Sequence, residues 1–154
     1  MERRSSRAAS LAADLRRAAA RLSTQLQPIG AARWNQVSAP GTWSIGKDVE
    51  HVVEALGYHE WIVRRTIGDT VPSRRPSLER SRMTSGIGPE DGVDLMRRRA
   101  RHVERLILRL TDAQLDLPTR PSRANAQSLA VTIERVLIGH LDTHRTSIED
   151  KLHR

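Results

Sequence analysis

The sequence contains no cysteine. Disulfides, thiolate metal ligands and a cysteine nucleophile are therefore excluded. Aromatic side chains are scarce, with three tryptophans, one tyrosine and no phenylalanine among 154 residues, so a set of stacking platforms for single-stranded nucleic acid is not expected. No segment approaches the roughly 18 consecutive apolar residues that a membrane span requires, which predicts a soluble protein without a membrane partner.

Lysine is also rare, and Lys47 and Lys151 are the only two in the sequence. The formal net charge of +8 therefore comes mainly from the many arginines. The arginines are spread over every predicted helix, so we interpret most of them as solvated surface and expect no nucleic-acid partner. Residues 1–22 are rich in arginine, alanine and serine and superficially resemble an organelle-targeting peptide. Apolar residues recur there at helical spacing, however, so we expect a core helix and a cytoplasmic location.

Apolar residues follow the helical period in four segments, and no segment of comparable length alternates like a strand. The segments run from about Ser6 to Gln27, from Ser44 to about Ile67, from near Pro89 to about Leu110, and from Ser128 almost to the end. The sequence therefore predicts an all-α fold, a four-helix bundle, formed by a single domain over residues 1–154. The connections at about 28–44, 68–88 and 111–128 could each span the bundle, which leaves its topology open.

His140 and His144 are four residues apart, which places both rings on one helical face about one turn apart. Both belong to the apolar stripe of the last segment, together with Val136, so they should face the bundle interior. His51 lies at a matching depth in the second segment if these two helices are antiparallel. The three residues therefore predict a metal site of neutral nitrogens suited to Zn, Ni, Fe or Cu. Three protein ligands leave one coordination position open, as in catalytic sites.

The remaining histidines are weaker candidates for metal ligands. His59 lies two turns beyond His51 and is expected to be packed or hydrogen-bonded, His102 should lie on a solvated flank, and His153 is near the C-terminus. Asp48 lies one turn before His51 and is the candidate catalytic residue. It could orient the His51 ring or act as a base, or it could simply favour the N-terminal end of the helix dipole.

Two short motifs resemble those of the DinB/YfiT-like superfamily of metalloenzymes. Thr42-Trp43-Ser44-Ile45 followed by His51 is similar to the start of the second helix in that superfamily, and the segment 137–145, which contains His140 and His144, is similar to its closing H-x-x-x-H helix. The resemblance implies a four-helix bundle, often a homodimer, in which His51, His140 and His144 bind one divalent transition metal such as Zn, Ni or Fe. It also implies that Trp43 packs at the start of the second helix and that Ser44 caps that helix.

Characterised relatives include transferases and isomerases that use mycothiol, bacillithiol or glutathione, so the resemblance implies a low-molecular-weight thiol as a second cofactor. The leading hypothesis is a metal-dependent thiol S-transferase, isomerase or hydrolase, with a small-molecule substrate and an anionic cosubstrate held by arginines of the connection 68–88. The alternative is a non-catalytic metal- or ligand-binding bundle of the stress-response type. A basic nucleic-acid binder is the least favoured interpretation, and it would require a continuous arginine face.

Overall fold

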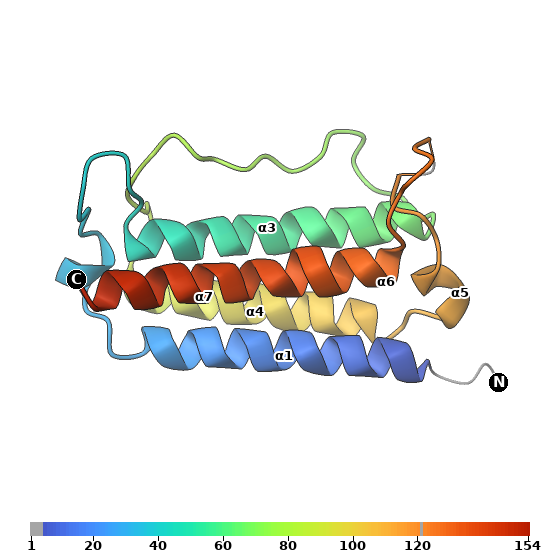
Figure 1. Ribbon diagram of the computed structural model, residues 1–154, viewed down its shortest axis with the longest axis horizontal. Helices are drawn as coiled ribbons and strands as arrows, with labels where there is room; N and C mark the ends of the chain where they lie inside the picture. Colours follow the sequence, from blue (N-terminus) through green and yellow to red (C-terminus); the bar gives the residue numbers. More distant parts are fainter. Residues whose placement is uncertain (1–4, 121) are drawn as a thin grey trace.

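The computed structural model describes residues 5–120 and 122–154, and helices dominate this part of the chain (Figure 1). The long helices are α1 (Ser6–Leu26), α3 (Ile45–Thr66), α4 (Pro89–Ile107) and a continuous fourth segment made of α6 (Leu129–Val131), the π-helix η1 (Thr132–Ile138) and α7 (Gly139–Leu152). Two short helices, α2 (Ala31–Trp34) and α5 (Asp112–Leu115), lie in connections that the sequence analysis left without structure. The described residues form no strand, so the all-α prediction is confirmed.

The helix boundaries follow local chemistry that the sequence already displayed. The Ser5 hydroxyl accepts a hydrogen bond from the backbone N–H of Ala8, and the Ser44 hydroxyl accepts one from that of Lys47. Each serine thereby satisfies one of the unpaired donors at a helix start. Gly68 follows α3 with a φ of +85°, a left-handed conformation that favours glycine and ends the helix.

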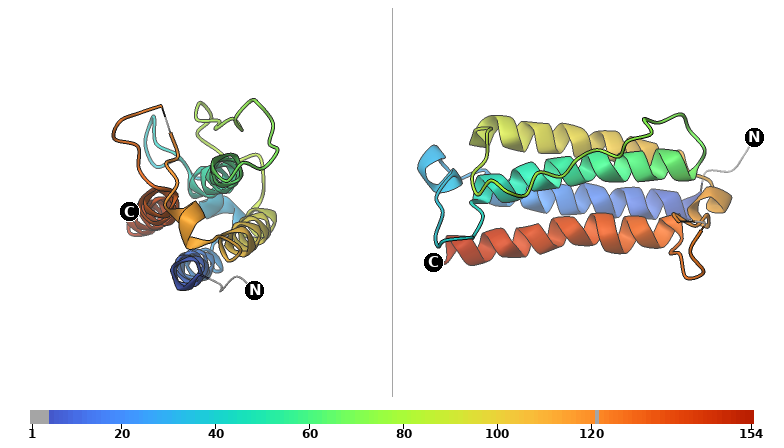
Figure 2. Two further views of the ribbon diagram at one scale, coloured as in Figure 1. Left: turned by 90° about the vertical axis from the view of Figure 1, so that its right-hand side faces the viewer. Right: turned by 90° about the horizontal axis from the view of Figure 1, so that it is seen from above.

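The four long helical segments pack as a bundle in which α3 runs antiparallel to α7, and α1 runs antiparallel to α4 (Figures 1 and 2). The connection 68–88 runs back along the whole of α3, so α3 and α4 point the same way (Figure 1). The antiparallel arrangement of α3 and α7 is the condition on which the matching depths of His51 and His144 depended. None of the described helices combines the length and apolarity needed to cross a membrane.

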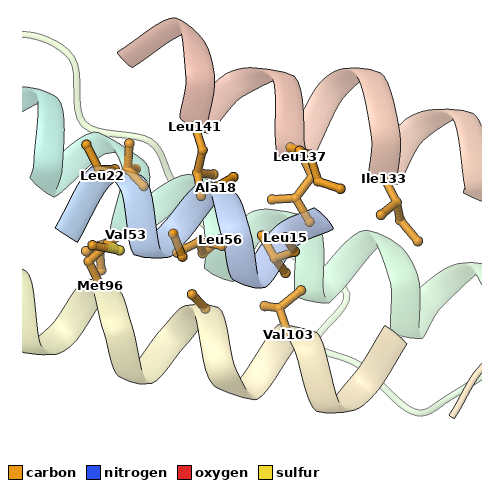
Figure 3. Close-up of a cluster of buried hydrophobic side chains, with 14 of the residues drawn as sticks. Leu15, Ala18, Leu22, Val53, Leu56, Met96, Val103, Ile133, Leu137 and Leu141 are labelled. Atoms are coloured by element: carbon orange, nitrogen blue, oxygen red, sulfur yellow. The ribbon is translucent and has the colours of Figure 1, made fainter. Parts of the chain in front are cut away.

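Side chains from all four helical segments meet in one apolar core (Figure 3). Burying such side chains drives helix association, because each releases about 1.5–3 kcal/mol relative to exposure. The buried residues in the close-up include Leu15, Leu22, Leu56, Met96, Val103, Ile133, Leu137 and Leu141. The core fixes the rotation of α3 and α7 about their axes, and so decides which of their side chains face each other.

Trp34 of α2 packs between the starts of α3 and α4 and is fully buried. Its Nε1 donates a hydrogen bond to the Ile87 carbonyl at 2.8 Å. A Cβ atom added to Gly46 would lie 2.3 Å from the Trp34 ring, and one added to Gly92 would lie 2.7 Å from it. Both glycines are therefore required by the close approach of an indole that the sequence analysis did not identify as a core residue.

The π-helix η1 overturns one detail of the predicted stripe. Its hydrogen bonds span five residues, so residues five apart share a face. Thr132 and Leu137 are accordingly buried, as are Ile133 and Ile138, whereas Val136 is 43 % exposed. The prediction that Val136 faces the core was wrong, because it assumed α-helical spacing throughout the segment.

Candidate metal centre

His51 of α3 and His140 and His144 of α7 converge near the end of the bundle where α3 begins. One nitrogen from each ring can be chosen such that all three lie within 4.8 Å of one another. The ring centroids of His51 are 5.0 Å from His140 and 5.2 Å from His144, and those of His140 and His144 are 4.5 Å apart. The structure thus brings together all three residues that the sequence analysis predicted as metal ligands, in an arrangement that could hold one metal ion.

The protonation and burial of these rings suit a metal. Burial, followed by the charges of His144 and Arg80, lowers the pKa of His51 to about 4. Burial and the neighbouring His144 and His51 likewise lower the pKa of His140 to about 4. His51 Nδ1 and His140 Nε2 are buried without a hydrogen-bond partner among the described residues. Neutral rings with unpaired buried nitrogens are the state that a divalent transition metal requires of its ligands.

Asp48 acts on a different ring from the one that the sequence analysis considered. Its Oδ1 lies 2.8 Å from Nδ1 of His144, and its Oδ2 contacts the ammonium group of Lys151. Of the roles left open for Asp48, orientation of the His51 ring does not apply, because the start of α3 packs against α7 and the carboxylate contacts His144 there. A carboxylate accepts from Nδ1–H, which leaves Nε2 of His144 as the nitrogen with a free lone pair. Asp48 also lies in the first turn of α3, so its favourable interaction with the helix dipole holds as well.

Trp43 packs at the start of α3, as the resemblance implied, and it also contacts the histidine cluster. Its ring centroid lies 5.0 Å from that of His51 and 6.3 Å from that of His144, and it stacks on the latter with an interplanar angle of 9°. Trp43 therefore covers one side of the histidine cluster, while Trp34 packs the helix starts.

The other histidines lie outside the cluster. His59 is buried, and its Nδ1 lies 2.8 Å from the Ala55 carbonyl, as expected for a hydrogen-bonded residue. His102 is exposed and pairs with Glu60, and His153 is exposed and pairs with Glu149.

A cavity of about 680 Å³ opens from His51 and His140 along the outer face of α3. This volume lies in the range of small-molecule sites. The cavity is bounded by the connection 68–88 on one side and by the described residues of the segment 116–128 (116–120 and 122–128) on the other, and both lie on the same side of the bundle around α3 (Figure 2, left). Arg75 and Arg80 of the connection 68–88 line it, as does Val136. The π-helix therefore turns an apolar side chain into this cavity.

Lys47 is a buried residue beside the site that the sequence analysis did not single out. Its side chain is 0 % exposed. The ammonium nitrogen lies 3.0 Å from a carboxylate oxygen of Glu50 and 3.0 Å from one of Glu79. Arg82 pairs with the same two carboxylates. We refer to Lys47, Glu50, Glu79 and Arg82 as the strap cluster, because it fastens the connection 68–88 to α3. The sequence did offer a signal, because Lys47 is one of only two lysines in an arginine-rich chain. The other, Lys151, also forms an ion pair at this end of the bundle, with Asp48.

Comparison with known proteins agrees with the geometry. Neither the curated proteins nor the solved structures returned a match. The model of the DinB superfamily matches residues 14–148, which include all three clustered histidines and most of the chain. The chain therefore belongs to the DinB superfamily.

Proposed function

We propose that the protein is a metal-dependent enzyme whose site is formed by His51, His140 and His144. The observation that carries the proposal is the cluster of three imidazoles, of which His51 and His140 line an open cavity and have buried nitrogens without a hydrogen-bond partner among the described residues. A fourth protein ligand is not part of this cluster among the described residues. Three-ligand sites with free access from a cavity are typical of catalysis, whereas structural sites are usually closed by four ligands.

The residues around the cluster have separable tasks. Asp48 holds the His144 ring in one orientation, and Lys151 keeps that carboxylate paired. Trp43 covers the rings of His51 and His144 and limits the access of water from that side. When bound, a divalent metal would lower the pKa of a coordinated thiol or water and so supply a nucleophile at neutral pH.

We further propose that the nucleophile is the thiol of a small-molecule cosubstrate, and that the reaction is a transfer or an isomerisation. The chain has no cysteine, so a thiol must come from outside the protein. Arg75 and Arg80 lie on the cavity wall and would attract an anionic cosubstrate into it. Mycothiol, bacillithiol and glutathione are the candidate thiols, because relatives in the superfamily that the chain resembles depend on them.

Calorimetric titration with Zn²⁺ and Ni²⁺ tests the metal site. Loss of a residue that only orients a metal ligand typically lowers metal affinity by ~10–100-fold. The His51→Ala variant removes a ligand itself and should lose more metal affinity than this, whereas His102→Ala should bind metal as tightly as the parent. Equal binding by His51→Ala and the parent would overturn the three-histidine site. Incubation of the metal-loaded protein with each thiol and a panel of electrophiles, followed by mass spectrometry, tests the reaction. Metal binding without any thiol adduct would favour the non-catalytic alternative.

A further inference from the structure

The cavity that leads to the histidine cluster has an unbalanced charge. Among the described residues that line it there is no aspartate or glutamate, but there are five arginines: Arg65, Arg75, Arg80, Arg120 and Arg123. They come from α3, from the connection 68–88 and from the segment 116–128, so three separate parts of the chain direct cations to one space. Such convergence produces a focused positive potential inside a concave surface.

These five arginines also differ from nearby arginines in that they form no ion pairs with the described residues. Arg64 pairs with Glu60, and Arg82 pairs with Glu79. Within residues 5–120 and 122–154, none of the five cavity arginines forms an ion pair or a side-chain hydrogen bond. The guanidinium of Arg65 instead lies 5.1 Å from the ring centroid of Trp61. The donors of these arginines are thus available to an anion from outside the protein.

Part of the remaining wall, on the side of α3, is apolar or aromatic, although polar side chains such as Thr119 and Asn125 also line the cavity. Tyr58 and Trp61 stack with ring centroids 6.2 Å apart and an interplanar angle of 22°, and Trp61 is fixed by a hydrogen bond from Nε1 to the Pro72 carbonyl. Ala55, Ile62 and the outward-turned Val136 also line the cavity. A simple inorganic anion would leave these apolar groups without contact, and a neutral apolar molecule would leave the arginines without counter-charges.

We propose that the cavity binds an organic anion with an apolar, preferably aromatic, body and a carboxylate or phosphate head. This assignment gives the substrate class of the site described under Proposed function and rests on that function for its catalytic meaning. The head group is held by Arg120 and Arg123 together with Arg65, and the body lies against Tyr58 and Trp61. Carboxylate and phosphate share the bidentate geometry that guanidinium groups recognise.

The test uses phenylacetate, benzyl phosphate and the neutral isostere phenylacetamide as probes of the full-length protein. Binding is measured by NMR titration, with the Trp61 indole signal as a local reporter. Both anions should bind more tightly than phenylacetamide, and the tighter of the two identifies the head group. The double variant Arg120→Gln/Arg123→Gln should raise the Kd of the anions by about tenfold or more. The control Arg101→Gln/Arg109→Gln removes the same charge from exposed positions outside the cavity and should leave the Kd unchanged.

Equal affinity for phenylacetate and phenylacetamide would overturn the proposal, as would an equal loss of affinity in both double variants. The titrations are made on chelator-treated protein as well as on metal-loaded protein. Failure of anion binding in a protein that still binds metal would contradict this inference alone. Failure of metal binding in a protein that still binds the anions would contradict the proposed function instead.

Discussion

The orientation of His144 depends on a single carboxylate. Asp48→Asn removes the charge that fixes the Nδ1–H tautomer while keeping the size of the side chain, so metal affinity should fall by about 10–100-fold. The fold should persist, because Asn can still accept a hydrogen bond from Nδ1. Calorimetry gives the affinity, and circular dichroism checks the fold. The control is Asp94→Asn, which alters an exposed carboxylate paired with Arg98 on α4. Unaltered affinity in Asp48→Asn would show that Asp48 serves the helix start alone.

The lowered pKa values of His51 and His140 predict a pH-dependent stability of the metal-free protein. Their folded-state pKa is about 4, against 6.5 for an exposed histidine. Between these values the unfolded chain binds protons that the folded chain does not, so stability is fully present above about pH 6.5 and decreases as pH falls toward 4. The combined loss at pH 5 is on the order of 1–2 kcal/mol, because solvent screening of the partly exposed His140 and the coupling between the rings reduce the separate contributions.

Urea unfolding of chelator-treated protein at several pH values measures this dependence. The double variant His51→Gln/His140→Gln should show a shallower decrease between pH 6.5 and 4, because glutamine does not titrate. A slope identical to that of the parent would contradict the prediction.

At the scale of the elements, the junction between α2, α3 and α4 is closed by Trp34. Gly46→Ala should destabilise the protein by about 1–3 kcal/mol, because the added Cβ would overlap the buried indole. Gly57→Ala is a matched control in the same helix, since its Cβ would meet only Arg99, at 3.8 Å. The control should be neutral or stabilising by about 0.5–1 kcal/mol, because alanine favours a helix interior. Denaturant unfolding of both variants checks the difference, and equal effects would show that Trp34 can move aside.

The connection 68–88 is held to α3 by the strap cluster. Hydrogen bonds from Ser81 and Lys47 keep the pKa of Glu79 well below its usual range, so the carboxylate is charged at neutral pH. Glu79→Gln should weaken the attachment and raise amide hydrogen exchange in segment 76–83, because Lys47 retains only Glu50. The control Asp69→Asn removes a carboxylate at the other end of the connection, where it pairs with Arg64. Exchange that is unchanged in Glu79→Gln would indicate that other contacts hold this segment.

At the scale of the whole molecule, self-association remains a prediction that stems from the family resemblance. The large apolar side chains exposed among the described residues are few and come from separate segments: Val37, Leu108, Leu117 and Val136. A homodimer would therefore need an interface with substantial polar content. Light scattering at micromolar concentration should give twice the chain mass of 17.3 kDa. A clean monomer would reject the dimer without affecting the metal site.

Much of this molecule was determined by sequence pattern. The spacing of apolar residues predicted the four long helical segments, because one helical face must enter the core. Ser44 and Gly68 marked the ends of α3 because their chemistry is local. His140 and His144 could be paired from their spacing alone, since i and i+4 always share a face of an α-helix.

Tertiary structure decided the rest, because it depends on which faces meet. The parallel arrangement of α3 and α4 follows from the path of the connection 68–88, whose length permitted either direction. Asp48 contacts His144 rather than His51 because two helices pack antiparallel. The π-helix that turns Val136 outward was missed because the apolar pattern of this segment also fits an uninterrupted α-helix. The cavity arginines are 58 positions apart in sequence, from Arg65 to Arg123, and only the folded chain places them around one space.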